Sequence, residues 1–81
     1  MLVRLLAFAS AAQAIGAGAC DWQLAGASTV RDLRLRLAID FPAIAPLLPR
    51  LAIAVNGTLA SPETSVGEGA EIALLPPVSG G

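Results

Sequence analysis

Residues 1–8 read Met-Leu-Val-Arg-Leu-Leu-Ala-Phe, and the interpretation of this stretch decides the fold. The alternation of its side chains predicts a strand with Val3, Leu5 and Ala7 on one face. The stretch also has features of a secretory signal, because a positive charge precedes an apolar run and residues 12–14, Ala-Gln-Ala, have the small-x-small spacing of a cleavage site. A buried strand requires the same apolar content, so we favour the strand and keep export as the alternative.

The sequence that follows predicts four more strands, with turns between them. The expected strands cover residues 19–25, 51–55, 58–60 and 71–75, and a short helical turn covers residues 10–18. The strand at 19–25 should pair with the first strand as a hairpin. Asn56-Gly57 is typical of a two-residue hairpin turn, and Gly67-Glu68-Gly69 predicts a tight turn before the last strand.

One longer helix is expected after residue 28. Thr29 can cap its start, and Asp32, three residues later, is the acidic member of a capping box. Val30, Leu33 and Leu37 recur at helical spacing. These three side chains therefore predict the face of the helix that packs on the sheet.

The polar side of this helix and its end are also predicted. Arg36 lies four residues after Asp32 and should form an exposed ion pair with it, while Arg34 should face solvent. Pro42 ends the helix, because proline has no backbone donor and restricts the residue before it. With two further prolines it should make residues 42–50 a rigid, irregular connection.

The order of these elements is strand, strand, helix, strand, short strand, strand, which is an α+β pattern. One main helix across a mixed sheet would let the first and last strands pair in parallel at its centre, as in the β-grasp, ubiquitin-like fold. The 81 residues suffice for one small core only. We therefore expect one β-grasp domain over residues 1–75 and a flexible, extended C-terminal Gly-Gly tail over residues 76–81.

The composition excludes several classes of function. The chain has no histidine, no lysine and a single cysteine, so it cannot build a zinc site, a Ser-His-Asp triad or a Walker phosphate loop by itself. Its five arginines are scattered and its formal net charge is −1, which argues against nucleic acid as a partner. The uncharged run at residues 5–20 is rich in alanine and glycine, which argues against a membrane span. Because the lone Cys20 suits a reducing cytosol, we expect a cytoplasmic protein. We also expect that the chain itself binds no metal or cofactor.

The reactive part of the chain is predicted to be its last six residues. They read Pro76-Pro77-Val78-Ser79-Gly80-Gly81. The prolines remove two backbone donors and favour an extended chain, so this tail should leave the sheet. Glycine has no β-carbon, so the tail can enter a narrow channel where protein groups and ATP phosphates approach the terminal carboxylate. Adenylation would give the Gly81 carboxylate a good leaving group, and sulfur could then displace AMP to form a thiocarboxylate.

Three stretches carry a resemblance to a known family. They read Leu-Leu-Pro-Pro-Val-Ser-Gly-Gly at residues 74–81, Ala-Val-Asn-Gly-Thr-Leu at residues 54–59 and Leu-Leu-Ala-Phe-Ala at residues 5–9. With these stretches the chain resembles, over nearly all its length, the small sulfur-carrier subunit of molybdopterin synthase, the MoaD-type branch of the ubiquitin-like sulfur carriers. That family typically has Asp-Gly-Asp-Glu before its last strand, whereas this chain has Glu-Gly-Ala-Glu at residues 68–71.

The resemblance implies that the chain is the non-catalytic sulfur donor of a sulfurtransferase. An E1-like adenylyltransferase would use ATP to adenylate Gly81, and a sulfur-relay enzyme would supply the sulfur. The tail would then enter the large subunit of molybdopterin synthase, within a heterotetramer. There it would donate sulfur to cyclic pyranopterin monophosphate to form molybdopterin, a step of molybdenum cofactor biosynthesis. Phe8, Leu59 and Leu75 match family positions of an exposed apolar patch for these partners, although ordinary core packing explains the same residues equally well.

Three other functions share some of these features. A sulfur carrier of a thiamine or amino acid pathway would have the same fold and Gly-Gly end. A ubiquitin-like protein modifier would use the same activated Gly81 to form isopeptide bonds with lysines of target proteins. A secreted binding module would lose residues 1–14 as a signal, and the first strand with them.

Overall fold

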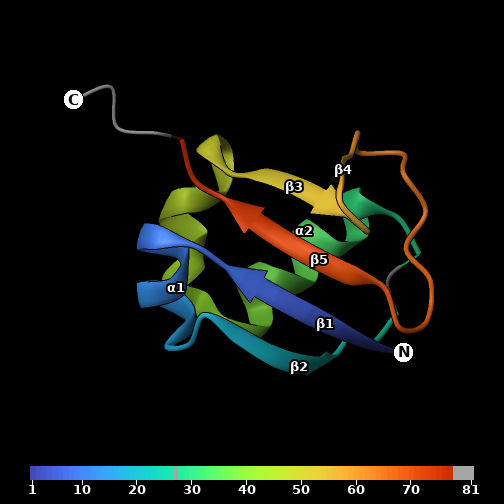
Figure 1. The fold of residues 1–81 in the computed structure, drawn as a ribbon, viewed down its shortest axis with the longest axis horizontal. Helices are drawn as coiled ribbons and strands as arrows, with labels where there is room; N and C mark the ends of the chain where they lie inside the picture. The colour runs from blue at the N-terminus through green and yellow to red at the C-terminus, as the bar shows by residue number, and fades with distance from the viewer. Residues whose placement is uncertain (27, 78–81) are drawn as a thin grey trace.

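Five strands form one mixed sheet in the computed structural model, which describes residues 1–26 and 28–77 (Figure 1). The strands are β1 (Leu2–Ala7), β2 (Ala19–Gln23), β3 (Ala52–Val55), β4 (Thr58–Leu59) and β5 (Glu71–Leu75). Their order across the sheet is β2-β1-β5-β3-β4. The pair of β1 and β5 is parallel, and the other pairs are antiparallel. The predicted β-grasp fold, with its first and last strands parallel at the centre, is confirmed.

Three helical segments lie on one side of the sheet (Figure 1). They are α1 (Ala9–Ile15), α2 (Val30–Asp40) and the 3-10 helix η1 (Pro42–Arg50). The predicted inner face of β1, formed by Val3, Leu5 and Ala7, packs in one buried cluster with Leu33 and Leu37 of α2. This cluster is the core, and it lies between the sheet and the helices. In the part of the chain that the structure describes, no helix has the length and apolar character needed to cross a membrane.

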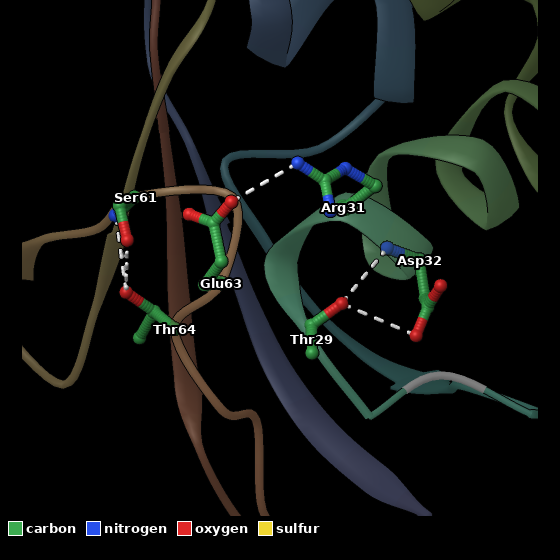
Figure 2. Close-up of polar contacts among 6 residues, drawn as sticks. All are labelled: Thr29, Arg31, Asp32, Ser61, Glu63 and Thr64. Carbon is green, nitrogen blue, oxygen red and sulfur yellow. Dashed lines mark hydrogen bonds and ion pairs between the residues drawn. The ribbon is translucent and has the colours of Figure 1, made fainter.

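The first turn of α2 contains the predicted cap (Figure 2). The Thr29 hydroxyl accepts a hydrogen bond from the Asp32 backbone N–H at 3.4 Å. The Asp32 carboxylate accepts from the Ser28 backbone N–H at 3.4 Å, and from the hydroxyls of Ser28 and Thr29 at 3.2 Å each. Hydrogen bonds to a carboxylate favour its charged form. These bonds, above all the one from the Ser28 N–H and then that from Thr29, hold the pKa of Asp32 below its usual value of 3.8.

The predicted ion pair between Asp32 and Arg36 is wrong. Arg36 pairs instead with Asp40, four residues further along α2, at 2.8 Å. The reason is that the cap holds the Asp32 carboxylate over the start of the helix, away from the following turn. Asp40 also accepts a hydrogen bond from the indole N–H of Trp22 at 2.8 Å, which ties the end of α2 to β2.

Residues 42–50 form a 3-10 helix rather than the predicted irregular connection. Proline fixes φ at about −65°, a value within the range of the 3-10 helix, so the prolines remove donors without opposing this backbone shape. In a helix with three residues per turn, positions three apart eclipse one another. Pro46 and Pro49 are three apart and therefore lie on one ridge of η1.

Arg34 is half-buried, although the sequence predicted that it faces solvent. Its guanidinium donates to the backbone carbonyl of Leu48 at 3.2 Å and to that of Leu51 at 2.8 Å. The carbonyls at the end of a helix lack partners within the helix, and a cation there satisfies them. Arg34 therefore fixes the C-terminal end of η1 against α2.

The hairpin of β3 and β4 turns at Asn56-Gly57, as predicted. Both residues have positive φ, 51° and 85°, as a type I′ turn requires. The Asn56 side-chain carbonyl accepts a hydrogen bond from the Glu71 N–H at 2.9 Å. The turn is therefore attached to the start of β5, next to β3 in the sheet.

Candidate partner-binding site

The face of the sheet that the helices leave uncovered, called the outer face, carries a row of apolar side chains. Directly opposed residues of neighbouring strands project to the same face. The register places five such residues in line, one from each strand: Ala19, Leu6, Ala73, Ala54 and Leu59. The row ends at Leu59, whose exposed fraction is 70%.

A second apolar row lies at the end of the sheet where β5 finishes. Ala52 is opposite Leu75 on the outer face. Phe8 continues β1 in an extended conformation, beyond the last paired residue, and is 49% exposed. Alternation along β1 and β5 therefore brings the predicted partner residues Phe8, Leu59 and Leu75 to one face of the sheet. Their contact with a partner stays a prediction.

The opposite end of the outer face is charged. Arg4 of β1 is opposite Asp21 of β2 and Glu71 of β5, and it forms an ion pair with Asp21 at 3.1 Å. Both side chains of that pair are largely exposed, so the pair contributes little to stability. The outer face is thus apolar towards the end of β5 and charged towards its start.

The tail begins beside the apolar end of the outer face. β5 ends at Leu75, and the chain continues through Pro76, which is half-buried, and Pro77, which is exposed. Because proline has no backbone N–H, neither residue can donate a hydrogen bond to a neighbouring strand. The other predicted tail residues, Val78, Ser79, Gly80 and Gly81, lie outside the described residues. Their roles, and the entry of Pro76 and Pro77 into a partner, stay predictions.

Sequence reasoning missed part of this surface. Of the first apolar row it named only Leu59, because only the register shows that Leu6, Ala73 and Ala54 lie in line with it. The alternation in β1 already placed Leu6 on the same face as Phe8, and that signal could have extended the site. The positions contributed by β3 depend on pairing between distant strands, which no local pattern reveals.

The sequence of the chain matches the model of the ThiS family over residues 5–81. The chain belongs to the ThiS family. With nearly the whole chain covered by the match, the resemblance to the ubiquitin-like sulfur carriers is confirmed. The β-grasp sheet and the family together identify a small carrier protein.

Solved structures similar to this ThiS-family chain come from bacteria and archaea. SAMP1 from Haloferax volcanii is 27% identical, each chain covers 100% of the other, and the TM-score is 0.82. The small archaeal modifier protein 1 from Methanosarcina acetivorans is 26% identical with a TM-score of 0.81, and the match covers 99% of this chain and 96% of that one. A chain of the complex of subunits 1 and 2 of molybdopterin-converting factor from Helicobacter pylori is 29% identical, covers 100% in both directions and has a TM-score of 0.70. These findings identify the chain as a sulfur carrier or ubiquitin-like modifier.

Proposed function

We propose that this ThiS-family chain is the sulfur-carrier subunit of molybdopterin synthase and acts in molybdenum cofactor biosynthesis. The observation that carries the proposal is the sequence Leu-Leu-Pro-Pro-Val-Ser-Gly-Gly at residues 74–81. It starts inside β5, so the reactive end is joined directly to the central part of the sheet. The similarity to a chain of the converting-factor complex supports the same assignment.

The reacting atoms belong to Gly81. One oxygen of its carboxylate attacks the α-phosphorus of ATP, pyrophosphate leaves, and an acyl adenylate forms. Hydrosulfide delivered by the sulfur-relay enzyme then attacks the carbonyl carbon and loses its proton, while the bond from that carbon to the AMP oxygen breaks and AMP leaves. Sulfur has now replaced one oxygen, and the terminus is a thiocarboxylate that donates its sulfur to cyclic pyranopterin monophosphate.

The acid and base groups for these steps come from partners. The chain has no histidine and no lysine, which are common proton carriers near neutral pH. ATP is therefore a substrate of the E1-like adenylyltransferase rather than a cofactor held by this chain. The chain is a non-catalytic subunit, and it meets each partner in the cytoplasm.

The apolar end of the outer face is the proposed contact for the large synthase subunit. Phe8, Leu59 and Leu75 offer exposed or half-exposed apolar area. Such patches mark protein interfaces, and a few anchors in them carry most of the binding energy. A large subunit bound to this patch lies next to the start of the tail. The tail can then enter the active site of the large subunit within a heterotetramer. The E1-like adenylyltransferase would use the same patch at a different time.

A second candidate function is that of a ubiquitin-like protein modifier. It is favoured by the similarity to SAMP1, the small archaeal modifier protein 1. The chemistry differs only in the last step, where the nucleophile that attacks the activated carbonyl carbon of Gly81 is the amine of a target lysine and not sulfur. Because this chain has no lysine, such conjugates would form on lysines of other proteins. A sulfur carrier of a thiamine or amino acid pathway is the remaining alternative.

The test of the proposal is mass spectrometry of the full chain after incubation with ATP, its adenylyltransferase and its sulfur-relay enzyme. Cleavage after Arg50 releases residues 51–81, which contain neither methionine nor cysteine. A sulfur-for-oxygen mass gain in that peptide therefore cannot be oxidation of those side chains. We expect this mass gain. We also expect that it disappears when the large subunit and cyclic pyranopterin monophosphate are added, and that molybdopterin is then formed.

The control is a chain extended by one residue beyond Gly81. It should fold normally and acquire no sulfur, since its terminal carboxylate no longer belongs to a glycine that fits the channel. Undiminished sulfur transfer by this unprocessed chain would overturn the mechanism. Conjugates to target lysines without molybdopterin formation would favour the modifier instead. The N-terminal peptide in the same spectrum tests the export alternative, which requires a terminus after residue 14.

A further inference from the structure

A groove of about 530 Å³ lies where the tail leaves the sheet. It is separate from the outer face and is walled mainly by η1. Its lining includes Ser10 from α1, Pro46, Leu47, Pro49 and Arg50 from η1, and Pro76 after β5. The groove therefore has an apolar wall, one hydroxyl and one cation, and the start of the tail forms its opposite side.

The wall of the groove is rigid. Pro46 and Pro49 lie on one ridge of η1, and each has a fixed φ. The two hydrogen-bonded carbonyls of Leu48 and Leu51 anchor the end of η1 to Arg34. A preformed apolar wall loses little conformational entropy when a partner packs on it.

Arg50, the cation of the groove, differs from the other arginines in its contacts with the described residues. Arg4, Arg31 and Arg36 form ion pairs, and Arg34 donates to backbone carbonyls. Arg50 is exposed and has no ion pair or side-chain hydrogen bond with any residue in the ranges 1–26 and 28–77. None of the described residues that line the groove is acidic. A carboxylate brought by a partner would complement this charge.

The length of the tail limits how far a partner can lie from the groove. Four residues follow Pro77, and four extended residues span at most about 14 Å. An enzyme that acts on Gly81 must therefore open its active site within that distance of Pro77, and the rim of the opening lies against the groove. Arg50 lines the groove together with Pro76 and Pro77, so it is placed to contact such a rim rather than the reacting atoms of Gly81.

We propose that the groove and Arg50 form a second docking site, which binds an acidic segment at the mouth of the enzyme that activates Gly81. A carboxylate of that segment pairs with the Arg50 guanidinium, and a neighbouring apolar side chain packs against the ridge of Pro46 and Pro49. This inference rests on the proposed activation of Gly81 by ATP. It adds a charge-dependent contact to the apolar contact of the outer face.

The experiment measures activation of the full chain by its adenylyltransferase, as pyrophosphate release at increasing carrier concentration. In Arg50→Glu we expect KM to rise about tenfold while kcat is unchanged, because the lost contact contributes equally to the ground state and the transition state. Arg50→Lys keeps the charge and should stay close to the wild type. The rise in KM should shrink as salt concentration increases, since exposed charges are screened.

The matched control is Arg31→Glu, which changes the net charge by the same amount. Arg31 is paired with Glu63 near the start of α2 and does not line the groove (Figure 2). It should leave KM unchanged, and thermal unfolding of both variants should match the wild type within a few degrees.

Each other outcome overturns the docking site. An unchanged KM in Arg50→Glu means that no acidic segment binds there, and an equal rise in Arg31→Glu means that only net charge matters. A fall in kcat alone would place Arg50 at the reacting atoms instead. Failure of the wild-type chain to be activated at all would overturn the proposed function, and this inference with it, so the two failures are distinguishable.

Discussion

The two faces of the sheet differ in what covers their apolar side chains. Leu74 and Leu75 are consecutive residues of β5, yet Leu74 is 0% exposed beneath the helices while Leu75 is half-buried on the outer face. On the inner face α1, α2 and η1 close a single core. Within the described residues, no helix covers the outer face of the sheet (Figure 1), and the register places the apolar side chains of Leu6, Ala73 and Leu75 on it.

This difference separates stability from recognition within one sheet. Side chains of the inner face contribute to folding through burial, whereas exposed side chains of the outer face, such as Phe8 and Leu59, remain available for burial by a partner. The apolar content of the chain, 56%, is therefore divided between a core and a surface. Changes on the two faces should have separable effects, and the following predictions test this.

The largest effect is expected from deletion of residues 1–14. The deletion removes β1, which pairs with β2 on one side and β5 on the other, together with the core residues Val3 and Leu5. Without this internal strand, both of its neighbours have unpaired edges and the core has a large cavity, so we expect no cooperative folding. The cooperativity of folding is measured by thermal unfolding, followed by circular dichroism and by Trp22 fluorescence. A truncated chain with a sharp unfolding transition would contradict the prediction and would favour the export alternative.

A smaller effect is expected from truncating one leucine on each face. Leu74→Ala removes a fully buried side chain and should lower the free energy of unfolding by about 2–5 kcal/mol, measured by urea denaturation. Leu75→Ala, at the next position, removes a half-buried side chain and should cost about 1 kcal/mol or less.

Partner binding should respond in the opposite order. Leu75→Ala should weaken the affinity for the large synthase subunit about tenfold, if it is one of the anchors of the interface. Leu74→Ala should leave the affinity unchanged at temperatures where it is folded. Titration calorimetry with the two variants measures this contrast. Equal affinity in the wild type and Leu75→Ala would remove Leu75 from the interface.

Local patterns in the sequence predicted the elements of the fold well. Alternation located β1 and β5, and the Asn56-Gly57 pair located the hairpin, because each feature depends on residues close together in the chain. The parallel pairing of the first and last strands followed from the order of elements. Composition directed attention towards partners, since the chain has no histidine and no lysine for acid–base chemistry of its own.

Competition between local contacts was harder to predict. Arg36 has an acid four residues away on either side, and only the cap on Asp32 decides that it pairs with Asp40. Arg34 donates hydrogen bonds to carbonyls at the end of η1 instead of facing solvent. The reason is that residues 42–50 form a regular helix whose end lies beside α2. The groove at Arg50 likewise needs three segments far apart in sequence, which no single pattern contains.

The smallest effect concerns the charge of Asp32 at the start of α2. Its pKa in the folded protein lies below its usual value of 3.8, because the Ser28 N–H and the Thr29 hydroxyl donate to the carboxylate. A lowered pKa means that the folded chain holds the proton less tightly than the unfolded chain. The charged Asp32 carboxylate therefore stabilises the folded chain above about pH 4, and this stabilisation is lost as pH falls through the folded pKa.

The variant Asp32→Asn isolates this contribution from that of the other acids. The difference in free energy of unfolding between wild type and Asp32→Asn should be small and constant near neutral pH. It should decrease below about pH 4, where the wild-type carboxylate becomes protonated. A difference that persists unchanged to lower pH would mean that the side chain caps the helix through its shape rather than its charge.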